Sequence, residues 1–226
     1  MKKSPNDAPE GAILQRDNET YAIVPRTPVG LLNAEHLEKV ASVVRKFDIP
    51  IIKITSGQRF ALVGIKEEQL DNVWKDLEMD QGRAKTNELC MHYVQACPGT
   101  EVCRYGKQDS LGLGNEIEEM FTGKPLLAKF KLGVSGCTFC CAESYVRDIG
   151  FVGTKNGWTL SIGGNSGGRP RIGDVIAKDL EKEDAIELMK KFVDFYMDNA
   201  KKRERTARFV ERIGLDNIKE AILPKE

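Results

Sequence analysis

The 226-residue sequence lacks an excess of either charge and lacks any long apolar run. Lys plus Arg and Asp plus Glu number 34 each, so the formal net charge is zero. A general nucleic-acid binder normally carries a basic excess, so that class is disfavoured. No apolar run approaches the roughly 20 residues that span a membrane, so no membrane segment is expected.

Two sequence signals are also missing. The first residues, MKKSPNDAPEG, carry two lysines without an apolar stretch behind them, so we expect no secretory signal and a cytoplasmic protein. The segment GLGNEIEE has neither the G-x-G-x-x-G spacing nor the preceding strand of a dinucleotide site. No dinucleotide-binding motif is therefore predicted.

The first third of the chain predicts a small α+β unit with the order strand, helix, strand, strand, helix. Residues 1–18 are polar and lack periodicity, which predicts a loose arm. Residues 80–88 form a polar link, so the first unit is expected to cover 19–80. The predicted strands are 21–25, 49–55 and 59–65, and the predicted helices are 33–47, with Asn33 as N-cap, and 66–79.

The rest of the chain, residues 88–226, predicts a second α+β domain that ends in helices. Two β-rich segments flank Lys155–Gly157, which is typical of a hairpin. The apolar spacing at 183–201 predicts a long amphipathic helix, and the charged stretch after it is expected to continue helically. The other predicted elements are a helix at 109–123, a strand at 127–135 and a short helix at 141–149.

Cysteine is scarce, with six residues, yet five of them fall in two short stretches. Five residues separate Cys97 from Cys103, and three separate Cys137 from Cys141, with Cys140 between them. Thiolates suit iron–sulfur clusters, zinc or copper(I), and a four-iron cubane takes four cysteines. The alternatives are structural zinc, which usually prefers pairs spaced by two to four residues, and buried free thiols. The spacing alone leaves Cys140 and Cys141 equally possible as ligands.

Basic residues accumulate around these thiols. An anionic thiolate centre favours cationic neighbours. Lys129 and Lys131 are two apart on the predicted strand, so we expect both on one face of the sheet. The whole group is Arg104, Lys107, Lys129, Lys131, Arg147, Arg169 and Arg171.

Three stretches resemble the sulfite and nitrite reductases that carry sirohaem coupled to a [4Fe–4S] cluster: CPGTEVCRYGKQDSLGLG, KFKLGVSGCTFCCAESYVRDIGFV and GWTLSIGGNSGG. The resemblance is strongest from about residue 92 to 170. It extends back through ITSGQRFALVGI, which looks like the ferredoxin-like half-domain of that family. The chain resembles the small single-repeat, assimilatory-type form. A ferredoxin-like half-domain followed by a sirohaem/[4Fe–4S]-binding α+β domain is the fold that this resemblance implies.

The resemblance also implies roles for individual residues. Cys97, Cys103, Cys137 and Cys141 would ligate the cluster, Cys141 would bridge to the sirohaem iron, and Cys140 would be a bystander. Lys129 and Lys131 match the anion-binding lysines of the family. His92 replaces a family arginine and is read either as a proton donor or as a buried imidazole. Asn165 matches a loop that touches the macrocycle, and the carboxylates of sirohaem would be held by basic residues, for which the candidates are Arg59, Arg104, Lys107, Arg147 and Arg169.

The activity that the resemblance implies is the six-electron reduction of sulfite to sulfide, with nitrite to ammonia as second choice. A ferredoxin or a reductase subunit would supply the electrons, and a second copy of the chain is a possible partner. The alternatives are a [4Fe–4S] electron-transfer module without haem and a zinc-stapled structural protein. Cys90 lies away from the cysteine pairs and is expected to be a core thiol.

Overall fold

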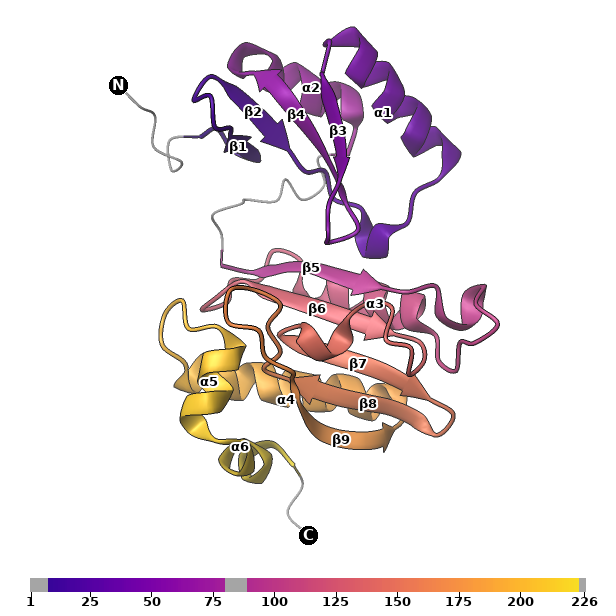
Figure 1. The fold of residues 1–226 in the computed structure, drawn as a ribbon, viewed down its shortest axis with the longest axis vertical. Helices are drawn as coiled ribbons and strands as arrows, with labels where there is room; N and C mark the ends of the chain where they lie inside the picture. The colour runs from indigo at the N-terminus through magenta and orange to yellow at the C-terminus, as the bar shows by residue number, and fades with distance from the viewer. Residues whose placement is uncertain (1–7, 80–88, 224–226) are drawn as a thin grey trace. The chain divides into compact units, whose positions relative to one another are not determined.

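The computed structural model describes residues 8–79 and 89–223, and the chain divides into two compact units, Met1–Glu88 and Leu89–Glu226. Of the expected loose arm, residues 1–7 lie outside the described part, as does the polar link at 80–88. Within the described residues, no helix has the length and apolar character needed to cross a membrane. Each unit is described by itself (Figure 1).

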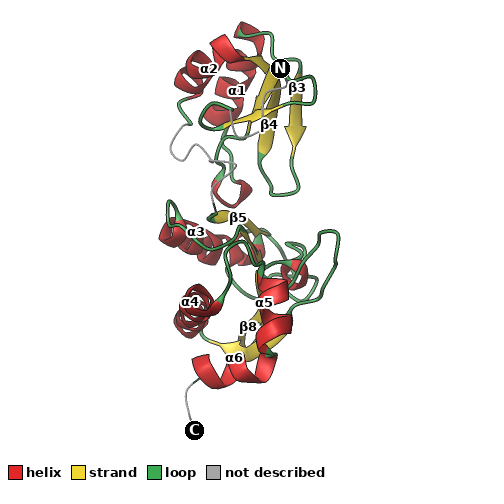
Figure 2. Cartoon of the chain, turned by 90° about the vertical axis from the view of Figure 1, so that its left-hand side faces the viewer, coloured by secondary structure: helices red, strands yellow, loops and turns green. Residues whose placement is uncertain are grey.

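The first unit is an antiparallel sheet with the strand order β1-β2-β4-β3, covered by two helices on one face (Figure 2). Its core is built around Tyr21, Leu62 and Trp74, which are almost fully buried. The expected order of strand, helix, strand, strand and helix is found from β2 to α2, and an unpredicted strand, β1, precedes it. The elements are β1 Ala12–Leu14, β2 Thr20–Ile23, α1 Ala34–Lys46, β3 Ile51–Ile54, β4 Phe60–Lys66 and α2 Leu70–Leu77.

Two details of this unit compare directly with the sequence expectations. Asn33 is the N-cap of α1, and its side chain accepts a hydrogen bond from the backbone N–H of His36 at 2.8 Å, as predicted. Ala12–Leu14 is a strand paired with β2 and not part of a loose arm. Burial of Ala12 stabilises this pairing, and the segment is too short for its alternation to be visible in the sequence.

The second unit is a five-stranded mixed sheet with the order β5-β6-β7-β8-β9. The first three strands are parallel and the last three antiparallel, and β7 and β8 form the predicted hairpin. The strands are β5 Met91–Ala96, β6 Phe130–Ser135, β7 Ile149–Thr154, β8 Gly157–Ile162 and β9 Asp174–Leu180, and the helices are α3 Ser110–Phe121, α4 Lys182–Asn199, α5 Thr206–Ile213 and α6 Leu215–Ile222.

Helices α3 and α4 lie on the same face of this sheet (Figures 1 and 2). On that face Phe130 of β6 stacks edge-on against Tyr196 of α4, with ring centroids 4.8 Å apart. Since side chains alternate along a strand, Lys131 points to the opposite face.

Two helix predictions in this unit are wrong. Residues 141–149 form only one 3-10 turn, Ser144–Val146, because Glu143 before it adopts a left-handed backbone (φ 54°) that a helix does not continue through. The chain after α4 also leaves the helix: Ala200 is extended, and α5 begins only at Thr206. The Tyr196 hydroxyl, which donates to the Glu204 carbonyl, holds this non-helical segment in place.

Candidate metal centre and anion site

The two cysteine stretches meet because β5 and β6 are adjacent and parallel. Cys97 directly follows β5, and Cys137 comes two residues after the end of β6. The carboxyl ends of neighbouring parallel strands lie at the same edge of a sheet, where ligand sites are usual in sheets of this kind. The Cys97 N–H donates to the Val134 carbonyl at 3.1 Å, which continues the pairing of the two strands up to the cysteine.

Two glycines allow the cysteine loops to touch. A Cβ placed on Gly136 would lie 2.7 Å from the Cα of Gly99, closer than side-chain carbons approach a backbone. The Gly136 N–H donates to the Cys97 sulfur at 3.1 Å. Its carbonyl accepts from the backbone N–H groups of Lys107 and Gln108 at 2.8 and 3.1 Å. The loops after β5 and β6 therefore form one hydrogen-bonded structure.

The other four thiols of these loops lie close enough to Cys141 to act on its charge. Burial raises the pKa of the Cys141 thiol, and Cys97, Cys137, Cys103 and Cys140 raise it further, because neighbouring thiolates repel the charged form. Cys97 is buried, while Cys141 is exposed. A cationic metal cluster would reverse this effect and favour the thiolates.

Cys140 occupies a special backbone position. Its φ is +56°, a left-handed conformation that costs energy in a residue with a side chain. Its N–H donates to the Cys137 carbonyl at 3.1 Å, and its carbonyl accepts from Glu143 at 2.8 Å. The 137–141 stretch is thus a tight turn and not a helix.

The donor set fits an iron–sulfur cluster. No three His, Cys, Asp or Glu side chains converge as they would around a single metal ion, in residues 8–79 and 89–223. A four-iron cubane needs a different arrangement. Each cysteine binds its own iron atom, so the cysteine sulfurs do not converge on a single position. The soft donors, and the N–H group that already bonds one of the sulfurs, suit such a cluster.

Lys131 lies at the centre of a cationic cluster. In the register of β5 and β6, Lys131 is opposite Tyr93, and its Nζ lies 5.8 Å from the centroid of that ring. Burial lowers the pKa of Lys131, and Arg205, Arg147 and Lys129 lower it further, while the carboxylate of Asp148 opposes them. Lys129 lies just before β6, so its charge acts on Lys131, and their expected position on one face of the sheet stays a prediction.

Asp148 binds two members of this cluster, Lys131 through its backbone and Arg205 through its side chain. It was not identified from the sequence. Its carboxylate is almost fully buried and accepts hydrogen bonds from three partners. The Lys131 backbone N–H donates at 2.8 Å, the Thr206 hydroxyl at 2.6 Å, and Arg205 donates through Nε at 3.1 Å and Nη2 at 2.5 Å. No pattern in the sequence signals this pairing, because Asp148 and Arg205 are 57 residues apart.

Arg147 is a buried cation on the same face. It donates through Nη2 to Gln95 at 2.7 Å and to Glu143 at 2.5 Å, and through Nη1 to Ser166 at 3.1 Å. Its Nε is buried without a hydrogen-bond partner in the described part of the chain. Its guanidinium carbon lies 5.9 Å from the centroid of the Tyr93 ring. A buried donor without a partner is costly, which makes this group a candidate for binding an anionic ligand.

Asn165 and Arg169 form a loop of their own. The Asn165 side chain donates to the Arg169 carbonyl at 2.7 Å, and its oxygen accepts from the Gly167 N–H at 3.2 Å. The Arg169 guanidinium is mostly exposed and lies 3.7 Å from Glu211 of α5. Asn165 thus shapes the loop with its side chain, and Arg169 reaches solvent.

The remaining candidates are spread more widely. Arg104 lies over the Tyr105 ring at 5.2 Å, and both Arg104 and Lys107 are exposed. His92 is half-buried in β5, with its ring 5.9 Å from that of Tyr93. Arg59 is buried in the first unit, so it is described only within that unit.

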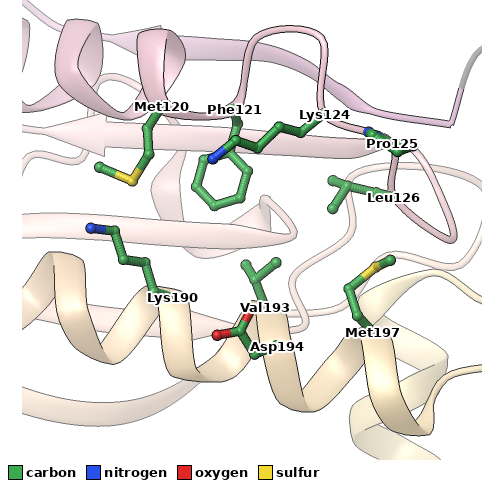
Figure 3. A pocket seen from close by; sticks show the side chains of 9 residues that line it. All are labelled: Met120, Phe121, Lys124, Pro125, Leu126, Lys190, Val193, Asp194 and Met197. Atoms are coloured by element: carbon green, nitrogen blue, oxygen red, sulfur yellow. The ribbon is translucent and has the colours of Figure 1, made fainter.

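A separate pocket of about 300 Å³ lies between α3 and α4, on the helical side of the sheet (Figure 3). Met120, Phe121 and Val193 give it an apolar lining, and Lys124 and Lys190 lie at its sides. None of the sequence-predicted site residues lines it. The pocket is therefore separate from the thiols and from Lys131.

An α+β unit that gathers five thiols in two adjoining loops is typical of an iron–sulfur oxidoreductase. The chain belongs to the nitrite and sulfite reductase family. Residues 89–226 match the model of the nitrite and sulphite reductase 4Fe-4S domain, and residues 13–80 match that of the nitrite/sulfite reductase ferredoxin-like half domain. The fold class expected from the sequence is confirmed.

Individual relatives support the same family. The assimilatory-type sulfite reductase of Nitratidesulfovibrio vulgaris is 60% identical over 96% of this chain and 99% of its own length. The nitrite reductase [NAD(P)H] of Bacillus subtilis is 40% identical over 93% of this chain but only 26% of its own length. Among solved structures, the NirA protein of Mycobacterium tuberculosis shares the fold, with a TM-score of 0.77 and 19% identity over 96% of this chain and 43% of that one.

Proposed function

We propose that this chain is a sirohaem-dependent reductase that reduces sulfite to sulfide, with nitrite to ammonia as the second choice. The observation that carries the proposal is the position of the thiols at the ends of β5 and β6, on a sheet that carries Lys131 on the face opposite α4. The Nitratidesulfovibrio relative, which matches this chain over nearly its whole length, is named as a sulfite reductase.

Cys97, Cys103, Cys137 and Cys141 would hold the cluster, with the exposed Cys141 as the ligand that faces the haem. When bound, the cluster and the sirohaem supply electrons and an iron atom that takes the anion through sulfur or nitrogen. Cys140 would stay outside the ligand set, as the family resemblance implies, and its backbone N–H and carbonyl would form the turn that places Cys141.

The side chains on the Lys131 face of the sheet would bind the anion and supply protons. Reduction of hydrogen sulfite to hydrosulfide takes up six electrons and six protons and releases three water molecules. Lys131 suits proton donation because burial and the neighbouring cations lower its pKa, so its ammonium releases a proton more easily than a free lysine does. Lys129 would add positive charge beside it, and His92 would donate protons if its ring faces the bound anion.

The carboxylates of sirohaem would be bound by basic side chains. Arg147 is the best-supported of them, because its Nε is buried and makes no other hydrogen bond in the described residues. The remaining basic candidates are Arg104, Lys107 and Arg169 of the same unit and Arg59 of the first unit, and Asn165 would contact the macrocycle.

The electrons would come from a separate protein, such as a ferredoxin or a reductase subunit, in the cytoplasm. This chain matches only about a quarter of the relative whose name includes NAD(P)H, and it lacks the glycine fingerprint of a dinucleotide site. A protein of this kind would therefore receive electrons at its surface.

A second copy of the chain would complete the site if the single repeat behaves as one half of a twofold arrangement. The test mixes a Cys141→Ser chain with a Lys129→Met/Lys131→Met chain, each inactive alone. Recovery of part of the activity in the mixture supports a shared site. No recovery, with active protein of monomeric mass, contradicts it.

A visible spectrum of the purified, cofactor-loaded protein tests the proposed function. Sirohaem gives sharp absorption bands in the red, whereas a cluster alone gives broad brown absorption. The proposal predicts the red bands together with turnover of sulfite by reduced viologen. Broad absorption without red bands would favour the electron-transfer module that carries only a cluster.

A further inference from the structure

Arg205 lies on a segment that is fixed next to the start of β6. The backbone N–H of Arg203 donates to the Leu127 carbonyl at 2.7 Å, just before that strand. Glu204, the next residue, is held by Arg212 through Nε at 2.8 Å and Nη2 at 2.7 Å. Arg205 itself is the extended N-cap residue of α5, so its backbone position is set from both sides.

The Arg205 side chain has two different edges. Its Nε and Nη2 bind the carboxylate of Asp148, which is 1% exposed, while the Arg205 side chain is 34% exposed. Nη1, on the other edge of the guanidinium, makes no hydrogen bond to any residue that the structure describes. Arg205 is thus held rigidly on one side and keeps a donor on the other.

The same carboxylate also fixes Lys131. Asp148 accepts from the Lys131 backbone N–H, so Arg205 and Lys131 are positioned by one buried group. Arg205, Arg147 and Lys129 place positive charge near the Lys131 ammonium, and the carboxylate of Asp148 opposes them. Three cations around a fourth repel one another, and a bound anion would relieve that repulsion.

We infer that Arg205 is a further anion-binding residue of the oxyanion site, contributing a fixed positive charge and its Nη1 donor beside Lys131. A guanidinium suits this task because its planar fork can bind Asp148 with one edge and an oxyanion with the other. The inference deepens the proposed function and rests on it, because it assumes that the anion binds on the Lys131 face.

The test compares equilibrium binding of sulfite to the cofactor-loaded protein in wild type and variants. Arg205→Met should raise the Kd for sulfite about tenfold to a hundredfold, the effect of losing one charge-assisted hydrogen bond. Arg205→Lys should recover part of the affinity, because an ammonium keeps the charge but cannot bind Asp148 and the anion with two edges. Arg208→Gln, an exposed position on the same helix, is the matched control and should leave the Kd unchanged.

A purely structural role for Arg205 makes a different prediction. Arg205→Met leaves Asp148 buried without its ionic partner, so the single variant is expected to be less stable. The double variant Arg205→Met/Asp148→Asn removes that buried charge and should regain stability while its Kd for sulfite stays raised. A double variant with wild-type stability and wild-type Kd would overturn the inference.

A second probe separates this inference from the proposed function. If the wild-type protein reduces neither sulfite nor nitrite, the proposed function is wrong. Arg205 is then tested by binding of inorganic phosphate, because a fixed guanidinium beside Lys131 attracts any tetrahedral anion. Weaker phosphate binding in Arg205→Met than in Arg208→Gln supports the anion-binding role, and equal binding contradicts it.

Discussion

Replacing Lys131 with Met should slow sulfite reduction far more than it disturbs the fold. The backbone N–H of Lys131, which donates to Asp148, is unaffected by the substitution. Methionine is unbranched and of similar length, so it can pack against the Tyr93 ring as the lysine stem does. The substitution therefore removes the charge and the proton while keeping the packing.

The expected loss follows from the interaction that is removed. A charge-assisted hydrogen bond contributes about 1.5–3 kcal/mol, which corresponds to roughly a tenfold to hundredfold fall in kcat/KM. The assay measures sulfide formation with reduced viologen, alongside iron, sulfide and haem content. Lys155→Met, in the exposed turn between β7 and β8, is the matched control.

The pH dependence of the rate gives a second test of Lys131. Burial and the charges of Arg205, Arg147 and Lys129 lower its pKa, against the opposing effect of Asp148, so the ammonium should deprotonate at a lower pH than a free lysine. Activity that needs this proton falls on the basic side at that lower pKa, and Lys131→Arg should move the fall to higher pH. Unchanged kcat/KM in Lys131→Met, with full cofactor content, would refute the assignment.

Three further predictions concern the thiols and the fold. Cys141→Ser should lose the cluster absorption and Cys140→Ser should keep it, and the reverse result would exchange the two roles. Glu204 has its pKa lowered to about 2, chiefly by Arg212, so the stability it adds is present above its ordinary pKa of 4.5 and is lost as the pH falls towards 2. Glu204→Gln should lower the free energy of unfolding at pH 7 by about 2 kcal/mol and flatten its fall in acid, as chemical denaturation measures; an unchanged acid profile would exclude this linkage. Gly136→Ala should prevent cluster assembly, because its Cβ would meet the backbone of Gly99, and normal iron content in this variant would show that the loops can separate.

Much of the second unit could be predicted because its signals are local. The hairpin of β7 and β8 and the helix α4 have strong periodicity and clear turns. Strand β5 was missed because its residues are buried on both faces at the end nearest Cys97, so the alternation of a half-buried strand is absent. Strand β9 was missed for another reason: its apolar residues Val175, Ile176 and Ala177 are consecutive and do not alternate with polar ones, and Ile176 is its only buried residue.

The candidate site was only partly accessible to sequence reasoning. The cysteine spacing is local and specific, so the thiol pairs could be identified without a structure. The contact of Asp148 with Arg205 depends on the path of the chain after α4. The helix ends at Ala200, and the following segment is held next to the start of β6 by the hydrogen bond from the Arg203 N–H to the Leu127 carbonyl. That break follows from tertiary hydrogen bonds, which periodicity does not reveal.

The central claim is that this chain reduces sulfite with electrons delivered through a thiol-bound cluster and sirohaem. The most direct measurement is the number of reduced viologen equivalents consumed for each sulfide formed by the purified, cofactor-loaded protein. The account predicts sulfide as the product and six one-electron equivalents for each molecule. Viologen oxidation without sulfide, or no oxidation when sulfite is added, would contradict it.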